Sequence, residues 1–134
     1  MDRSVFINLP TRDLESSRAF YARLGLESDP LFSGENSACV ILSEATRLMI
    51  LPEEQFQRFS STKPVGDPAS GVQAVIAISM ESRNEVDRLI DAALEAGATE
   101  PREPQDHGFM YGRAFEDPEG RIWEVFHMAS PPPQ

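Results

Sequence analysis

The chain has 134 residues, 22 of them acidic and 12 basic, so its formal net charge at pH 7 is -10. This length suits one compact unit with its own core, and the acidic surplus argues against a nucleic-acid surface and against binding to anionic membranes. The single cysteine, Cys39, excludes a disulfide framework within one chain. Because no basic-then-apolar leader and no membrane-length apolar stretch is visible, we expect a cytoplasmic protein.

The first third of the chain predicts a strand followed by a capped helix. Residues 4–9 form a short apolar run typical of a strand. Asp13 is placed to cap the helix that follows, and Gly25 is placed to end it. Residues 26–35 predict a weaker strand that Pro30 interrupts.

Two short strands and a brief helix are expected next. Residues 37–42 and 47–51 have strand patterns, and residues 53–59 have a helical one. Residues 60–70 are rich in Ser, Pro, Gly and Asp and show no periodicity. We therefore expect a linker there, and it is the natural place for a lid or for a boundary between two halves.

The second half repeats this order. Residues 71–80 predict a strand, and Ser82 with Glu85 predicts a capping box at the start of a helix that Gly97 ends. Residues 99–107 are polar and interrupted by prolines, which favours an edge strand running into a loop.

A hairpin closes the chain. Residues 117–120 read Asp-Pro-Glu-Gly, with the preferences of a type I turn between two aromatic-rich strands. Alternation in the second strand places Trp123 and Val125 on one face, and Glu124 and Phe126 on the other. Glu124 is therefore a carboxylate on an otherwise apolar face.

Such a carboxylate requires a partner, because burying an unpaired charge is costly. The candidates are a metal ion, a basic side chain, a hydrogen-bonded water or substrate, or a raised pKa that keeps Glu124 neutral. The structural alternative is a salt bridge from Glu124 to Arg113 on the neighbouring hairpin strand.

The order of strand, helix and three strands thus occurs twice. It predicts an α+β fold of two βαβββ repeats with cupped mixed sheets in a single domain of residues 1–128, the repeats covering about 3–59 and 71–128. Residues 129–134 contain three prolines and predict a flexible tail. Each helix covers only one face of its sheet, so the other face needs a second repeat or a second chain. We therefore expect a homodimer.

Two motifs resemble one known family. They are Asp13-Leu14-Glu15-Ser16-Ser17-Arg18-Ala19-Phe20-Tyr21 and Asp117-Pro118-Glu119-Gly120, the latter followed by Ile122-Trp123-Glu124-Val125. Both are similar to the glyoxalase/bleomycin-resistance/dioxygenase group, the vicinal-oxygen-chelate superfamily. The resemblance implies that a small organic molecule binds in the cup. It leaves open a glyoxalase-type lyase or isomerase, a dioxygenase-like enzyme, and a metal-free protein that sequesters or senses a drug-like molecule.

Family metalloenzymes hold a divalent ion through His, Gln or Glu on the first and last strands of each repeat. Carried over to this chain, the four positions are Phe6, Met49, Val75 (with Gln73 as an offset alternative) and Glu124. Glu124 alone matches directly, as a metal ligand or as the base that takes a proton alpha to a carbonyl. The cofactor is therefore unknown, with a divalent metal implied only by the resemblance.

Six further side chains are candidates for ligand contact: Phe6, Asn8, Met49, His107, Tyr111 and Arg113. The first three would line the cup in the family arrangement. Tyr111 and Arg113 suit recognition of an anionic or aromatic ligand, and equally a half-polar outer face. His107 lies in a polar loop, where it is either exposed to solvent or overhangs the cup as an acid or base.

Overall fold

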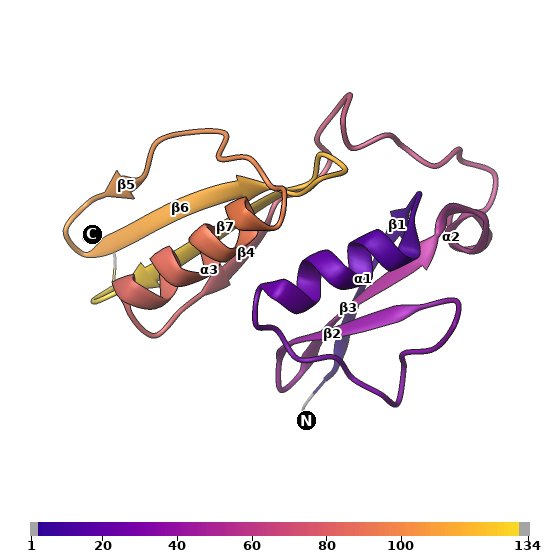
Figure 1. The fold of residues 1–134 in the computed structure, drawn as a ribbon, viewed down its shortest axis with the longest axis horizontal. Coiled ribbons are helices and arrows are strands. Elements are labelled where there is room, and N and C mark those ends of the chain that lie inside the picture. Colours follow the sequence, from indigo (N-terminus) through magenta and orange to yellow (C-terminus); the bar gives the residue numbers. More distant parts are fainter. Residues whose placement is uncertain (1–2, 132–134) are drawn as a thin grey trace. The chain divides into compact units, whose positions relative to one another are not determined.

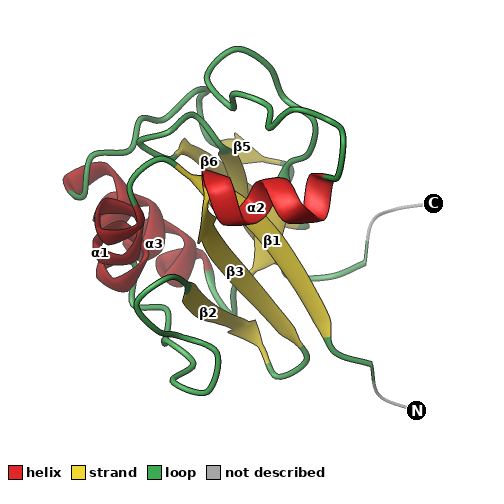
Figure 2. Ribbon diagram, turned by 90° about the vertical axis from the view of Figure 1, so that its right-hand side faces the viewer, coloured by secondary structure: helices red, strands yellow, loops and turns green. Residues whose placement is uncertain are grey.

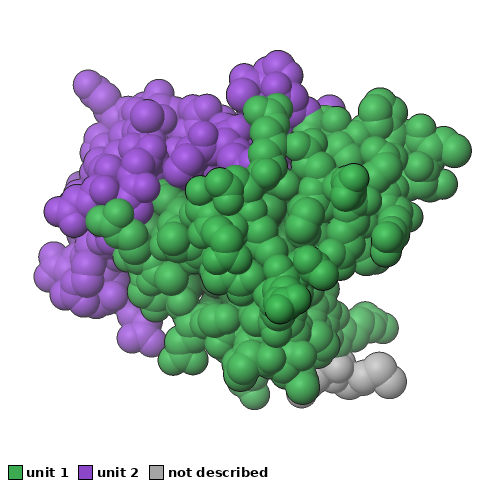
Figure 3. Space-filling model, turned by 45° about the vertical axis from the view of Figure 1, so that its right-hand side comes forward, with its two compact units in different colours: residues 1–66 green, residues 67–134 purple. Residues whose placement is uncertain are grey.

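The structure is a computed structural model that describes residues 3–131, and it divides into two compact units, residues 1–66 and 67–134 (Figures 1 and 3). The division falls inside the predicted linker of residues 60–70. Within this described part, each unit has one mixed sheet, with two helices in unit 1 and one in unit 2, which confirms the predicted α+β class. Residues 132–134 of the predicted flexible tail lie outside the described part. No helix in residues 3–131 has the length and apolar character needed to cross a membrane.

Unit 1 consists of β1 (Val5–Thr11), α1 (Leu14–Arg23), β2 (Ala38–Ser43), β3 (Thr46–Pro52) and α2 (Glu53–Ser60). Figure 2 shows β1, β3 and β2 as neighbours in one sheet, with β1 parallel and β2 antiparallel to β3. Leu48 and Ile50 of β3 are fully buried, as is Tyr21 of α1. The Thr11 and Ser17 hydroxyls lie 2.7 Å apart and join this face of the sheet to α1.

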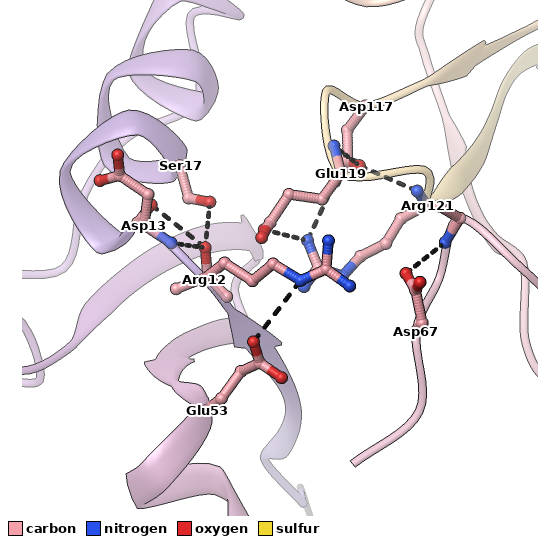
Figure 4. A network of polar contacts seen from close by, with 10 residues as sticks. Arg12, Asp13, Ser17, Glu53, Asp67, Asp117, Glu119 and Arg121 are labelled. Carbon is pink, nitrogen blue, oxygen red and sulfur yellow. Dashed lines mark hydrogen bonds and ion pairs between the residues drawn. The ribbon is translucent and has the colours of Figure 1, made fainter.

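The predicted cap of α1 is confirmed. The Asp13 carboxylate accepts a hydrogen bond from the backbone N–H of Ser16 at 3.1 Å, at the helix start that Figure 4 shows. Gly25, directly after the helix, has a φ of +82°, in the left-handed region that glycine adopts without strain. Just before α1, the guanidinium of Arg12 forms an ion pair with Glu53 at the start of α2 (Figure 4).

The strand predicted over residues 26–35 is wrong. Only isolated bridges form there, Ser28 with Val40 among them. Pro30 has no N–H to donate, and the Asp29 carboxylate accepts from the backbone of Leu31 and from Arg47. These local bonds turn the chain away from a regular ladder, so the first sheet has three strands.

Unit 2 consists of β4 (Ile76–Ser79), α3 (Arg83–Glu95), β5 (Gln105–Asp106), β6 (Met110–Glu116) and β7 (Ile122–Met128). The sheet order is β4-β7-β6-β5, with β4 parallel to β7. The helix α3 runs along β6 and β7 (Figure 1) and buries Val86 and Ile90 with Trp123 and Val125 of the sheet. The predicted alternation of the last strand is thereby confirmed.

Two strands of unit 2 are shorter than predicted. In place of residues 71–80, β4 begins only at Ile76, which pairs with Trp123. In place of residues 99–107, only the two-residue β5 and a bridge from Thr99 to β6 form. Pro101 and Pro104 explain the interruption, because neither can donate to the ladder.

Half of the predicted capping box forms. The Ser82 hydroxyl accepts from the backbone N–H of Glu85 at 3.1 Å. The Glu85 carboxylate pairs instead with Arg88, one turn further along the helix, at 2.7 Å. An exposed i,i+3 ion pair of this kind thus replaces the reciprocal bond of the box.

The type I turn of the closing hairpin is confirmed, with the Gly120 N–H donating to the Asp117 carbonyl at 2.9 Å. The buried Asp117 carboxylate also accepts from the backbone N–H groups of Glu119 and Arg121, which Figure 4 shows around the turn. Gly120 has a φ of +108°, and a Cβ there would lie 2.8 Å from the Cα of Ala69. The turn therefore packs directly on the chain that enters unit 2.

This contact predicts that Gly120→Ala destabilises the protein more than Gly108→Ala does. Both glycines have positive φ, so both substitutions carry a backbone cost of about 1 kcal/mol. A Cβ at Gly108 meets nothing within 4 Å, whereas one at Gly120 clashes with backbone atoms, which adds about 1–3 kcal/mol. Urea unfolding of both variants measures the difference, and equal losses would contradict the packing of the turn on Ala69.

Candidate functional site

Glu124 lies in the middle of β7, on the sheet face opposite α3. Its register partners are Ala114 on β6 and Ala77 on β4. Its chain neighbours Trp123 and Val125 point the other way and are almost completely buried. The carboxylate therefore extends from an apolar sheet face, with Ile122 and Phe126 beside it on β7 and an alanine on each neighbouring strand, as the alternation predicts for β7.

The partner of Glu124 is Arg102. The Nη2 atom of Arg102 donates to Oε1 of Glu124 at 2.5 Å. The partner is thus a basic side chain, one of the predicted candidates, but the structural alternative that named Arg113 is wrong. Arg113 pairs with Val125 in the register of the hairpin, so its side chain is on the helix side of the sheet. One residue of offset moves a side chain to the other face.

The Arg102 side chain reaches Glu124 by crossing β6. Thr99 and Gln105 pair with β6, so the segment between them runs along the outer side of that strand. Because β6 lies between this segment and β7, the arginine has to span one strand. The β6 residue opposite Glu124 is Ala114, which is fully buried and has only a methyl side chain. A small residue at this point leaves room for the crossing.

The ion pair has hydrogen-bonding capacity left over. Within residues 3–131, Nη2 is the one Arg102 atom with a protein hydrogen bond, and Oε2 of Glu124 has none. The two side chains are 33% and 41% exposed. Donors and an acceptor therefore stand next to each other on an accessible face, with their net charge cancelled.

Arg113 is the centre of a separate cluster on the helix side. Its guanidinium donates to both oxygens of Glu100, at 2.9 and 3.0 Å, and to Asp87 of α3 at 2.9 Å. Tyr111 donates its hydroxyl proton to the same Asp87 at 2.6 Å. The Arg113 side chain is only 11% exposed. The hydrogen bonds to Glu100, followed by those to Asp87, raise the pKa of Arg113 and keep it charged.

The carboxylates of this side are stabilised as anions. Partial burial raises the pKa of Asp87 and is the largest single influence, but the hydrogen bonds from Tyr111 and Arg113 together outweigh it and lower that pKa. Arg83 binds Asp106 through two nitrogens at 2.7 and 2.8 Å. These bonds, and then the backbone N–H of Gly108, hold the pKa of Asp106 well below its usual value.

In unit 1, the structure brings Phe6, Asn8 and Met49 together on one sheet face. Asn8 pairs with Met49 across β1 and β3, and Phe6 precedes Asn8 by one full alternation. This face is the one opposite the Leu48 and Ile50 core. Phe6 is 39% exposed and contacts the ring of Phe32 edge-on at 5.2 Å.

The other predicted ligand contacts do not join Glu124 on its face. Tyr111 and Arg113 are on the helix side, engaged with Asp87. His107 is exposed after β5, with its ring stacked on Phe109 at 6.2 Å. Their roles in ligand binding stay predictions.

The residues do not fit a site for a hard divalent ion. Such ions take several oxygen or nitrogen ligands, whereas Phe6, Met49 and Val75 offer neither, and Glu124 is already paired with a cation. The offset alternative, Gln73, lies before the start of β4. The described part of the chain contains no group of three or more His, Cys, Asp or Glu side chains that could hold a metal ion.

Comparison with known families decides the relationship. The model of the Glyoxalase/Bleomycin resistance protein/Dioxygenase superfamily matches residues 3–125. The chain belongs to this superfamily. A comparison with curated proteins gave no match.

Solved structures show the same fold. A hypothetical protein from S. aureus has a TM-score of 0.78 at 24% identity, and the alignment covers 95% of this chain and 94% of that protein. A glyoxalase/bleomycin resistance protein/dioxygenase family enzyme from Burkholderia phytofirmans PsJN has a TM-score of 0.74 at 21% identity, covering 96% and 99%. A glyoxalase-related enzyme from Fulvimarina pelagi has a TM-score of 0.76 at 20% identity, covering 95% and 88%. The likeness establishes the superfamily fold.

Sequence reasoning missed Arg102 and Glu100. Strict alternation would place both on one side of an edge strand. In the structure they go to opposite sides, Glu100 to Arg113 and Arg102 to Glu124. The segment is irregular because of its prolines, so no periodic signal could have assigned these partners.

The ion-paired carboxylates of Asp87 and Asp106 predict a loss of stability in acid. Since Asp87 and Asp106 have lowered pKa values in the folded state, the unfolded chain binds their protons first. Stability is then full above the ordinary aspartate pKa of about 3.9 and falls as the pH drops through the folded values. Urea midpoints between pH 6 and pH 2 should fall steeply for the wild type and less for Asp87→Asn.

Asp91→Asn is the matched control, because Asp91 is 67% exposed and lies 3.5 Å from the same arginine. Its acid profile should follow that of the wild type. Parallel profiles for the wild type and Asp87→Asn would contradict the stabilising role of the Asp87 carboxylate.

Proposed function

We propose that this superfamily member binds a small organic molecule on the open faces of its sheets without a metal ion. The observation that carries the proposal is the ion pair of Arg102 with Glu124. Glu124 is the one directly matched metal position with a hard ligand atom, and a guanidinium already neutralises it. A divalent ion would have to displace that cation and would gain a single carboxylate ligand.

The surface around the pair supports ligand binding. Ala77 and Met128 are exposed on the Glu124 side of the second sheet, and Phe6 is exposed on the corresponding side of the first. Pockets for small molecules are mostly apolar and contain a few polar groups that orient the ligand. The Arg102–Glu124 pair supplies such groups for unit 2.

A metal-independent lyase or isomerase is the second candidate. It is favoured by the free Oε2 atom of Glu124 and by the 41% exposure of that side chain. Glu124 would then act as the base that takes a proton alpha to a carbonyl, a role that needs an oxygen within reach of the substrate.

The homodimer and the cytoplasmic location belong to the same proposal. β1 and β4 are edge strands of their own sheets, and among the described residues the second sheet packs against a single helix, α3. Uncovered faces and edges of this kind favour pairing with a second chain. The cytoplasmic location is supported by the acidic composition and the single cysteine.

Elemental analysis and thermal shift together test the metal-independent proposal. We expect purified protein without a stoichiometric divalent ion, and melting temperatures that respond to Mn²⁺, Ni²⁺ or Zn²⁺ no more in the wild type than in Glu124→Gln. Glu116→Gln is the matched control, since Glu116 is on the same strand face as Ala114. A stoichiometric ion that is lost in Glu124→Gln and kept in Glu116→Gln would overturn the proposal.

A further inference from the structure

The arrangement of the two side chains also indicates what kind of group they recognise. We propose that Arg102 and Glu124 bind the edge of a neutral carboxamide, whose carbonyl accepts from the guanidinium and whose N–H donates to the carboxylate. This inference rests on the proposed function and adds the class of ligand to it. A primary amide, a lactam or an imide presents such an edge.

The ion pair leaves a donor and an acceptor free for a ligand. Within residues 3–131, Arg102 makes one protein hydrogen bond through Nη2, so its other N–H groups are available as donors. Oε2 of Glu124 is available as an acceptor, because only Oε1 is engaged. A donor and an acceptor thus lie side by side, and they complement an acceptor and a donor that are adjacent in one group.

The charges of the pair favour a neutral ligand group. Arg102 and Glu124 cancel each other, so neither an anion nor a cation gains a net attraction. A carboxylate ligand would be drawn to Arg102 but repelled by Oε2, and an ammonium group would be drawn to Glu124 but repelled by Arg102. A neutral group that both donates and accepts satisfies the two side chains at once.

The apolar surroundings of the pair favour a ligand that satisfies both side chains. Ala77 and Ala114 flank Glu124 in the sheet, so the polar pair stands on an apolar surface. An analogue that lacks one of the two hydrogen-bonding groups leaves a charged side chain unpaired against the ligand, which is costly where water is excluded.

The segment that holds Arg102 is fixed before any ligand arrives. Glu100 is bound through both oxygens to the largely buried side chain of Arg113, and Asp106 is bound through both oxygens to Arg83. Arg102 lies between these two anchors. Ordering its backbone is therefore part of folding, and binding does not have to supply that entropy.

Three naphthalene probes of matched shape test the inference by titration calorimetry. They are 2-naphthamide, 2-acetonaphthone, which has a methyl group in place of the amide nitrogen, and 2-naphthoate, which is an anion. We expect the wild type to bind the amide about tenfold more tightly than either analogue, the difference that one hydrogen bond to a charged group provides.

Two variants separate the roles of the side chains. Arg102→Met should weaken binding of the amide and of the ketone alike, because the carbonyl that both probes share loses its donor. Glu124→Gln should reduce the preference for the amide over the ketone, because the amide N–H then donates to a neutral acceptor. Glu124→Gln should raise the affinity for 2-naphthoate, because Arg102 is then a cation without a partner. Arg88→Met is the control, since Arg88 is an exposed arginine that pairs with Glu85 on α3, and it should keep the wild-type ranking. Thermal melting of each variant verifies that it is folded.

Two results would count against the account in distinguishable ways. Equal binding of the three probes to the wild type, or an amide preference that is unchanged in folded Glu124→Gln, would overturn the amide inference but would not contradict binding to the apolar surface. Failure of all three probes to bind the wild type would overturn the proposed function, and the inference with it.

Discussion

The guanidinium of Arg102 lies across β6 on the carboxylate of Glu124, and the function proposed for this chain depends on that contact. A carboxylate on an apolar sheet face has to be compensated, and the kind of compensation decides the chemistry available. A metal ion would make the face a Lewis-acid centre. A guanidinium instead makes it a neutral pair that can donate and accept hydrogen bonds. An exposed pair contributes only about 0–1 kcal/mol to stability, so its importance lies in recognition.

Much of the fold follows from short-range patterns in the sequence. The Asp13 and Ser82 caps, the glycines after the helices and the Asp-Pro-Glu-Gly turn all depend on local hydrogen bonds, and the structure has each of them. Whether residues 26–35 form a strand depends on competition between ladder hydrogen bonds and local side-chain hydrogen bonds. There the Asp29 side chain binds Arg47 and the nearby backbone, and a ladder does not form. Periodicity cannot foresee which of two such sets of bonds prevails.

Of the two residues of the candidate site, Glu124 could be predicted from the sequence and Arg102 could not. Alternation alone places Glu124 on the open face, and the cost of an unpaired charge predicts a partner. The identity of that partner depends on which residues an irregular, proline-containing segment brings to the edge of β6. It also depends on Ala114 being small enough for an arginine to cross. The superfamily match, at low identity to solved structures, establishes the scaffold but not these contacts.

The ion pair itself can be observed directly by nitrogen-edited NMR of the arginine side chains at low temperature. A guanidinium held by a carboxylate rotates slowly, so the account predicts resolved Nη signals for Arg102 in the wild type. These signals should collapse in Glu124→Gln and persist in Glu116→Gln. Arg102 signals that show free rotation in the wild type, or that are indifferent to Glu124→Gln, would contradict the account.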